Sequence, residues 1–127
     1  MVGAAIVRDG RVLAARRTRP PGAAGRWEFP GGKVEPGESD ADSLVREVQE
    51  ELGVRVRVQA WLPGEVPIGE HHLLRVALVV PEGGDPVPTE HDEVRWLAVD
   101  ELATVDWLEA DRPFLTALSD LLPRLDG

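Results

Sequence analysis

The most informative part of this chain is residues 31–54, which run "GGKVEPGESDADSLVREVQEELGV". Two glycines come first, and the pattern after them predicts a helix from Ser39 to Leu52. Serine is a favoured helix cap, and Gly53 stands where a glycine commonly ends a helix. Aliphatic residues recur at every fourth position, so one face of this helix is expected to pack on the core. The opposite face is acidic.

The acidic face crowds three carboxylates, those of Glu47, Glu50 and Glu51, with Arg46 beside them. Glutamates three and four residues apart are neighbours on a helix, and each negative charge raises the pKa of the next. A divalent cation reverses that repulsion, because Mg²⁺ prefers oxygen ligands and is commonly shared between carboxylates and substrate phosphates. The glycines before the helix would let the backbone come close to such a group. Taken alone, the acidic run favours an ordinary solvated helix face, so the prediction of a metal site depends on the wider spacing.

Composition places the chain among globular proteins. Its 127 residues are 43% hydrophobic and 29% charged, and we expect a single domain over residues 1–127. No apolar run approaches the roughly 20 residues of a membrane span, and the first residues lack the basic start of an export signal. We therefore expect a cytoplasmic protein without a membrane partner. Because the sequence has no cysteine, any metal must be held by oxygen atoms or by the three histidines.

The charge balance narrows the choice of partner. A net charge of −9 argues against a surface that wraps a nucleic-acid polymer, because such a surface is basic. Five arginines nevertheless lie within residues 11–26. The planar fork of arginine suits phosphate oxygens, so the substrate could still be an anion, with a solvated strand and loop as the alternative.

Strands are expected on both sides of the helix. Asp9-Gly10, between two apolar segments, is the strongest short hairpin signal and predicts paired strands at residues 2–7 and 11–17. Further strands are predicted at residues 27–29, 54–62, 72–80 and 93–99, followed by a helical turn at 100–105 and a closing helix at 111–122. Asp111 is expected to cap that helix, with Pro113 in its first turn. This order of elements predicts a mixed sheet between helices.

The spacing within residues 32–54 resembles one family signature at every specified position. From Gly32 it follows G-x5-E-x7-R-E-U-x-E-E-x-G-U, where U is a bulky aliphatic residue, which is the motif of the Nudix hydrolases. The resemblance to the MutT-like subgroup covers most of the chain, including "WEFPGGKVEPGES" and "TEHDEVRW". It implies an α/β Nudix fold, an α/β/α sandwich with a mixed β-sheet. It also implies hydrolysis of a nucleoside triphosphate to the monophosphate and pyrophosphate with Mg²⁺, or with Mn²⁺ in its place.

The same resemblance assigns the metal side of the site. It implies that the metal ligands are the carboxylates of Glu47, Glu50 and Glu51 and the backbone carbonyl of Gly31. Glu47 is also a candidate for orienting or deprotonating the attacking water. Arg46 would lie along the helix and orient the glutamates, with a plain surface ion pair as the alternative.

Two further carboxylates follow from the resemblance. Glu90 falls where the subgroup has a carboxylate on a mobile loop, as a metal ligand or general base, and Asp92 or Glu93 could substitute for it. Glu38, at the start of the helix, would support the metal or loop geometry or cap the helix.

The substrate side is less sharply defined. Arg17 matches a phosphate-side arginine of the subgroup, and Lys33 could reach a phosphate or be solvated. Phe29 and Trp107 are candidates for walls of a base pocket or for the core, and His72 could border that pocket. All three histidines are otherwise expected to be surface or strand-end residues rather than catalysts.

Asp111 bears on which base is bound. An ionised aspartate can only accept hydrogen bonds, which suits the amino group of cytosine, and the surrounding sequence resembles the branch that prefers CTP or dCTP. Hydrolysis of 8-oxo-dGTP is one alternative, and a non-catalytic module that senses a nucleotide is another. Loss of motif glutamates would mark the sensing module, and this sequence retains them all. We expect a monomer or a homodimer.

Overall fold

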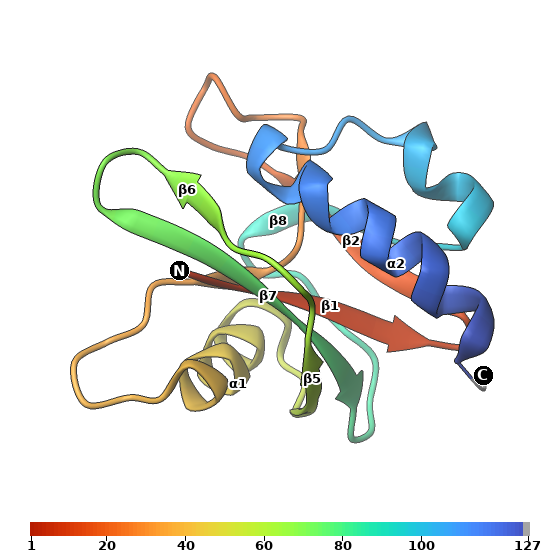
Figure 1. The fold of residues 1–127 in the computed structure, drawn as a ribbon, viewed down its shortest axis with the longest axis horizontal. Helices are drawn as coiled ribbons and strands as arrows, with labels where there is room; N and C mark the ends of the chain where they lie inside the picture. The colour runs from red at the N-terminus through yellow and green to blue at the C-terminus, as the bar shows by residue number, and fades with distance from the viewer. Residues whose placement is uncertain (126–127) are drawn as a thin grey trace.

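A computed structural model describes residues 1–125, in which helices cover both faces of a mixed sheet (Figure 1). This arrangement confirms the predicted α/β/α sandwich. The last two residues of the single domain expected over 1–127 lie outside the described residues. Within residues 1–125 no helix is both long and apolar enough to cross a membrane.

The strands are β1 (Val2–Arg8), β2 (Arg11–Arg17), β3 (Trp27–Glu28), β4 (Gly31–Gly32), β5 (Val56–Trp61), β6 (Val66–Ile68), β7 (His72–Pro81) and β8 (His91–Leu97). The α-helices are α1 (Asp40–Leu52) and α2 (Leu115–Leu121), and short 3₁₀ helices are η1 (Val99–Thr104), η2 (Glu109–Phe114) and η3 (Leu122–Arg124).

The central strand β1 changes its neighbour along its length. On one edge it pairs in parallel with β7, from Val2 to Ile6. On the other edge, Val2 and Gly3 pair with β4, whereas Val7 and Arg8 pair with β2. The main path of the sheet is β3-β2-β1-β7-β5, with β8 on β2 and β6 on β7. The sheet therefore divides beside β1 into a β4 side, which leads into α1, and a β2, β3 and β8 side.

The first hairpin forms as predicted. Asp9 and Gly10 both have positive φ angles, 55° and 73°. Two consecutive positive φ angles are typical of the turn whose twist matches that of paired antiparallel strands. This turn sets the register of β1 and β2, with Val7 opposite Val12.

Alternating side chains of the central strands build two cores, one on each face of the sheet. Ala4 and Ile6 of β1 pack on the α1 face, and Ala5 and Val7 pack on the α2 face. Because both faces are covered, these strands are apolar on both sides rather than alternating between apolar and polar residues. The site therefore rests on a sheet that is packed from both sides.

Two predicted elements differ in the structure. Residues Gly31 and Gly32 form the short strand β4, which was not among the predicted strands, and neither has a positive φ angle, so glycine is needed there for close approach. The closing helix α2 begins at Leu115, and Asp111 lies inside the preceding 3₁₀ helix η2. The cap predicted for Asp111 is wrong, because its side chain is buried beside the Phe29 backbone instead of at a helix start.

Candidate active site

Helix α1 places the acidic residues at the edge of the divided sheet. The Ser39 hydroxyl accepts a hydrogen bond from the Asp42 backbone N–H at 3.1 Å, and Gly53 ends the helix with a φ of 69°. Both ends are as predicted. Glu51, however, lies on the buried side of the helix and is only 5% exposed, whereas Glu50 faces outward with its side chain 59% exposed. The three motif carboxylates therefore have different environments.

The two glycines of β4 make room for this helix. A Cβ atom on Gly31 would collide with the Val2 carbonyl oxygen, which belongs to the neighbouring strand. A Cβ atom on Gly32 would lie 2.6 Å from the carboxyl carbon of Glu47. Close approach of backbone to backbone and of backbone to carboxylate is therefore the reason for glycine at both positions.

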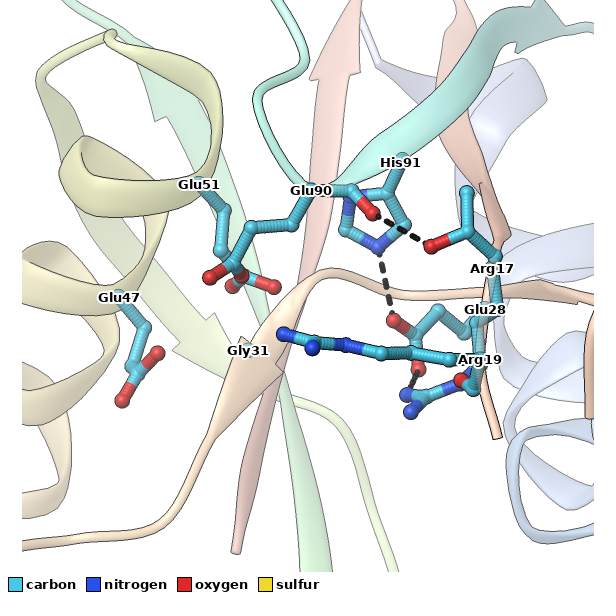
Figure 2. Close-up of a pocket in the computed structure, with 9 residues that line it drawn as sticks. Arg17, Arg19, Glu28, Gly31, Glu47, Glu51, Glu90 and His91 are labelled. Carbon is cyan, nitrogen blue, oxygen red and sulfur yellow. Dashed lines mark hydrogen bonds and ion pairs between the residues drawn. The ribbon is translucent and has the colours of Figure 1, made fainter.

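A pocket of about 220 Å³ lies between α1 and the β2, β3 and β8 side of the sheet (Figure 2). Figure 2 shows Glu47 and Glu51 on the α1 wall, with Arg17, Arg19 and Glu28 across from them. The lining residues are Arg17, Thr18, Arg19, Glu28, Gly31, Glu47, Glu51, Glu90 and His91. Carboxylates and guanidinium groups thus share one small space.

Glu90 is fixed opposite the helix by its neighbour Thr89. The Thr89 backbone N–H donates to the Glu51 carbonyl at 3.0 Å, and its hydroxyl lies 3.1 Å from the same oxygen. These bonds satisfy a carbonyl at the C-terminal end of α1, which has no partner within the helix. The segment before β8 is therefore tethered to α1, and Glu90 lines the same pocket as Glu47 and Glu51.

Arg46 lies along α1 against the carboxylates, as expected. Its Nε and Nη2 atoms donate to the two carboxylate oxygens of Glu38 at 2.8 and 3.0 Å, and its Nη1 donates to Glu47 at 3.0 Å and to Glu50 at 3.2 Å. The fork of two parallel bonds to Glu38 fixes the plane of the guanidinium. This pairing lowers the pKa of Glu38 and holds Glu47 in one orientation.

Glu51 is electrostatically unfavourable in the absence of a cation. Burial raises the pKa of Glu51 to about 8, and the charges of Glu28, Glu47 and Glu90 act in the same direction. Burial also raises the pKa of Glu47. Oε2 of Glu51 is buried and has no hydrogen-bond partner within residues 1–125. An unpartnered buried carboxylate oxygen beside other carboxylates fits a hard divalent cation, so the residues present suit the metal that the sequence predicts.

Four pocket residues were not predicted individually from the sequence, namely Thr18, Arg19, Glu28 and His91, and Arg19 was noted only as one of five clustered arginines. Glu28 of β3 accepts a hydrogen bond from Nη1 of Arg17 at 2.8 Å, and its other oxygen lies 2.8 Å from Nε2 of His91. His91, expected to be a surface or strand-end residue, stands at the start of β8 but is only 8% exposed. The available signals were local: Glu28 comes shortly before the two glycines, and His91 directly follows Glu90.

Several predicted substrate residues lie outside this pocket. Phe29 is buried in the core against Trp107, with ring centroids 4.8 Å apart. The backbone carbonyl of Lys33 accepts hydrogen bonds from the side chains of Ser43 and Arg46, which belong to α1. His72 is exposed at the start of β7, on the hairpin with β6. None of the three is among the residues that line the pocket.

Asp111 is buried next to the pocket rather than in it. It is 5% exposed, and burial raises its pKa to about 8, aided by the charge of Glu28 and opposed by the Phe29 backbone N–H and by Arg17. Asp111 is therefore mainly neutral at pH 7, and a neutral carboxyl group can donate a hydrogen bond as well as accept one. The expectation that Asp111 can only accept hydrogen bonds therefore applies to its ionised form.

Comparison with known proteins agrees with this geometry. The family model described as the NUDIX domain matches residues 1–118. The chain is 41% identical to a Mycobacterium tuberculosis protein named "Putative 8-oxo-dGTP diphosphatase 2", over 100% of this chain and 90% of that protein. It is 37% identical to the CTP pyrophosphohydrolase of Escherichia coli, over 95% and 91% of the two chains.

A solved structure shares the fold as well. The solution structure of the Escherichia coli ORF135 protein superposes with a TM-score of 0.79, at 34% identity, covering 94% of this chain and 87% of that one. The complete motif, its placement on α1 beside two close-packed glycines and the family match together show that this chain belongs to the Nudix hydrolase family.

Proposed function

We propose that this chain hydrolyses a nucleoside triphosphate to the monophosphate and pyrophosphate, using Mg²⁺ or Mn²⁺ held in the acidic pocket. The observation that supports this most directly is that an acidic wall and a basic wall face each other across the pocket. Glu47 and Glu51 face Arg17 and Arg19 across a pocket of about 220 Å³. One wall suits a metal ion, and the other suits phosphate oxygens that the metal does not neutralise.

The chain's residues have separate tasks in this proposal. Gly31, Glu47, Glu51 and Glu90 line the pocket, and the Gly31 carbonyl and these three carboxylates would hold the metal. Glu50, whose side chain faces outward, would join them after a change of rotamer. The metal, when bound, would supply a polarised phosphate and a more acidic water. Glu47 or Glu90 accepts a proton from the attacking water. Arg46 keeps Glu47 oriented through the 3.0 Å hydrogen bond.

The phosphates are expected to meet the opposite wall. Arg17 is positioned by Glu28, and it also donates through Nε to the Arg19 carbonyl at 2.9 Å. The two guanidinium groups stabilise negative charge on the departing pyrophosphate. Lys33, which is exposed and lies outside the pocket lining, would assist them only if its side chain reached the phosphates from outside.

Two bases remain candidates. Cytosine is the first, as in the substrate name of the Escherichia coli relative, and it fits Asp111 in its ionised form. Oxidised guanine is the second, as in the name of the Mycobacterium tuberculosis relative, and it is favoured by the neutral form of Asp111, which can also donate. Phe29 or His72 would contact either base only after a local rearrangement, because Phe29 is buried in the core and His72 is on the β6–β7 hairpin.

The proposal is tested with a panel of NTPs and dNTPs, including 8-oxo-dGTP and methylated cytosine nucleotides, with monophosphate and pyrophosphate as the measured products. We expect metal-dependent turnover, and a loss of about a hundredfold or more for Glu51→Gln, because a metal ligand is removed. Glu65→Gln, an exposed loop residue, is the matched control and should retain full activity. Turnover that is unchanged in EDTA would overturn the metal-dependent reaction.

The same panel separates the two bases and the sensing module. Asp111→Asn should change the ranking of cytosine against oxidised guanine if Asp111 contacts the base, and an identical ranking would remove it from recognition. Saturable nucleotide binding without any product from the whole panel would favour the non-catalytic sensing module.

A further inference from the structure

Glu28, Glu51 and His91 form a compact cluster on the inner side of the pocket. One ligand-type atom from each residue lies within 4.8 Å of the others. All three are well buried: Glu51 is 5% exposed, and the side chains of His91 and Glu28 are 3% and 12% exposed. Glu28 and His91 lie outside the motif of residues 32–54, so this cluster is not simply the motif's own set of ligands.

The cluster contains two buried polar atoms that lack partners. Neither Oε2 of Glu51 nor Nδ1 of His91 has a hydrogen-bond partner within residues 1–125. Buried polar atoms are nearly always paired, so two such atoms in one cluster need an explanation. A bound ion would supply the missing partner for Glu51.

The charge of the pocket also leaves room for a dication. Its carboxylates are those of Glu28, Glu47, Glu51 and Glu90, and its cations are Arg17 and Arg19. When all four carboxylates are ionised, as they would be as ligands of a cation, four negative charges and two positive charges leave a formal charge of −2 on these side chains. A dication would neutralise this charge, whereas in its absence the carboxylates repel one another.

The distance between His91 and Glu28 is close to the distance between two neighbouring ligands of one metal ion. Nε2 of His91 and Oε2 of Glu28 are 2.8 Å apart. Two neighbouring ligands at right angles around an ion with bonds of about 2.1 Å are separated by about 3 Å, so little movement is needed. The other oxygen of Glu28 is held by Arg17 at 2.8 Å, which fixes the carboxylate while leaving Oε2 for the ion.

We propose that Glu28, Glu51 and an imidazole nitrogen of His91 bind a divalent metal ion, and that this position favours Mn²⁺, Co²⁺ or Zn²⁺ over Mg²⁺. Imidazole nitrogen suits first-row transition metals, whereas Mg²⁺ prefers an all-oxygen set. Glu51 would be shared between this ion and the metal ion that the motif glutamates would hold. One carboxylate can offer one oxygen to each ion. The inference rests on the same pocket as the proposed function and adds a second, nitrogen-containing position to it.

The test uses the nucleotide-free protein with Mn²⁺ alone. Free Mn²⁺ is followed by EPR during a titration, and pulsed EPR measures the hyperfine coupling of bound Mn²⁺ to ¹⁴N. We expect an imidazole ¹⁴N coupling in the unmodified protein. His91→Gln, which keeps a donor facing Glu28, should lose the coupling and bind Mn²⁺ about tenfold or more weakly, with a smaller change in Mg²⁺ affinity measured by competition.

The exposed His71 provides the matched control. His71→Gln should retain both the ¹⁴N coupling and the Mn²⁺ affinity. Glu28→Gln tests the cluster independently of His91, and it should also weaken Mn²⁺ binding by about tenfold or more. Absence of ¹⁴N coupling in the unmodified protein, its persistence in His91→Gln, or unchanged Mn²⁺ affinity in a folded Glu28→Gln would each overturn the inference.

The two proposals fail in different ways. A protein that cleaves no nucleotide but shows the ¹⁴N coupling would contradict the proposed function and leave this metal position intact. An active hydrolase whose bound Mn²⁺ shows no ¹⁴N coupling would overturn this inference alone.

Discussion

Glu51 is destabilised by its own surroundings when no cation is bound. It is 5% exposed, one of its oxygens has no partner within residues 1–125, and Glu28, Glu47 and Glu90 add negative charge around it. A buried charge without a partner costs free energy that a neutral side chain of the same shape avoids. An ionised Glu51 is therefore needed to bind the metal, but it lowers the stability of the metal-free fold.

Glu51→Gln should accordingly stabilise the metal-free protein while it lowers turnover by about a hundredfold or more. In EDTA at pH 8 we expect the free energy of unfolding, measured by urea denaturation, to rise by about 1 kcal/mol or more. The added stability that Mg²⁺ gives the unmodified protein should shrink in the variant. Glu65→Gln should change neither quantity, and a less stable Glu51→Gln in EDTA would contradict the account.

Asp111 is expected to make a contribution to the free energy of unfolding that decreases as the pH rises. Its pKa in the folded protein is raised to about 8, above the value of about 3.9 for an unfolded chain, so the folded state binds the proton more tightly. This contribution to stability is complete below about pH 4 and is lost as the pH rises towards 8.

Asp111→Asn should therefore flatten the stability profile between pH 4 and pH 8. The variant gains on the unmodified protein as the pH rises, by at most about 1.4 kcal/mol for each unit by which the pKa is raised. Urea titrations at several pH values in EDTA measure this difference. A constant offset between the two proteins across that range would show that Asp111 ionises normally in the fold.

At the scale of single elements, β4 and α1 act as a pair because glycine lets them approach. Gly31 faces a backbone oxygen of β1, and Gly32 faces the movable carboxylate of Glu47. The same substitution at the two positions should therefore have different effects.

Gly32→Ala should fold and lose activity, because the new methyl group displaces the Glu47 carboxylate, the end of a flexible side chain. Gly31→Ala should lose stability, by about 2 kcal/mol or more, because backbone atoms cannot move aside as easily. Thermal unfolding and turnover measured for both variants check the contrast. Equal thermal stability of the two variants would show that the β1 contact tolerates a side chain.

Helix α1 could be predicted from the sequence because its signals are local. The cap at Ser39, the apolar spacing and Gly53 all lie within one segment. The pairing of β4 with β1 and the interruption of the last helix by η2 depend on contacts between distant residues, so no local pattern indicated them. Glu51 was placed on the acidic face, but it is only 5% exposed, and the segment at Thr89, distant in sequence, is hydrogen-bonded to its backbone carbonyl.

The candidate site likewise contains some residues that could be predicted from local spacing and others that could not. The motif glutamates have fixed spacing, and the family resemblance placed them together. Glu28 and His91 are 63 positions apart, and only the pairing of β3 and β8 with β2 brings them into contact. Residues that meet through a sheet carry no spacing signal, which is why this pair was missed.

At the scale of the whole molecule, a bound ion would connect the two sides of the divided sheet. Glu47 and Glu51 belong to α1, and Glu28 and His91 belong to β3 and β8. Ligands drawn from both sides would resist the separation of these parts, so metal binding should be linked to global unfolding.

Mn²⁺ at about a hundred times its dissociation constant should stabilise the protein by about 2.7 kcal/mol. For a chain of this length the midpoint of thermal unfolding should rise by roughly 10 °C. Differential scanning calorimetry with and without EDTA measures the shift. The rise should be much smaller in Glu51→Gln, and an equal rise in that variant would place the stabilising ion elsewhere.

The parallel pairing of β1 with β7 has a consequence for synthesis on the ribosome. The hairpin of β1 and β2 emerges first, yet β1 must wait for β7, which ends at Pro81, and β2 must wait for β8, which ends at Leu97. Until then both outer edges of an apolar hairpin are open to other nascent chains. Slowing translation before β7 and β8 have left the ribosome should therefore favour aggregation of this protein, whereas a pause after both strands are outside should not.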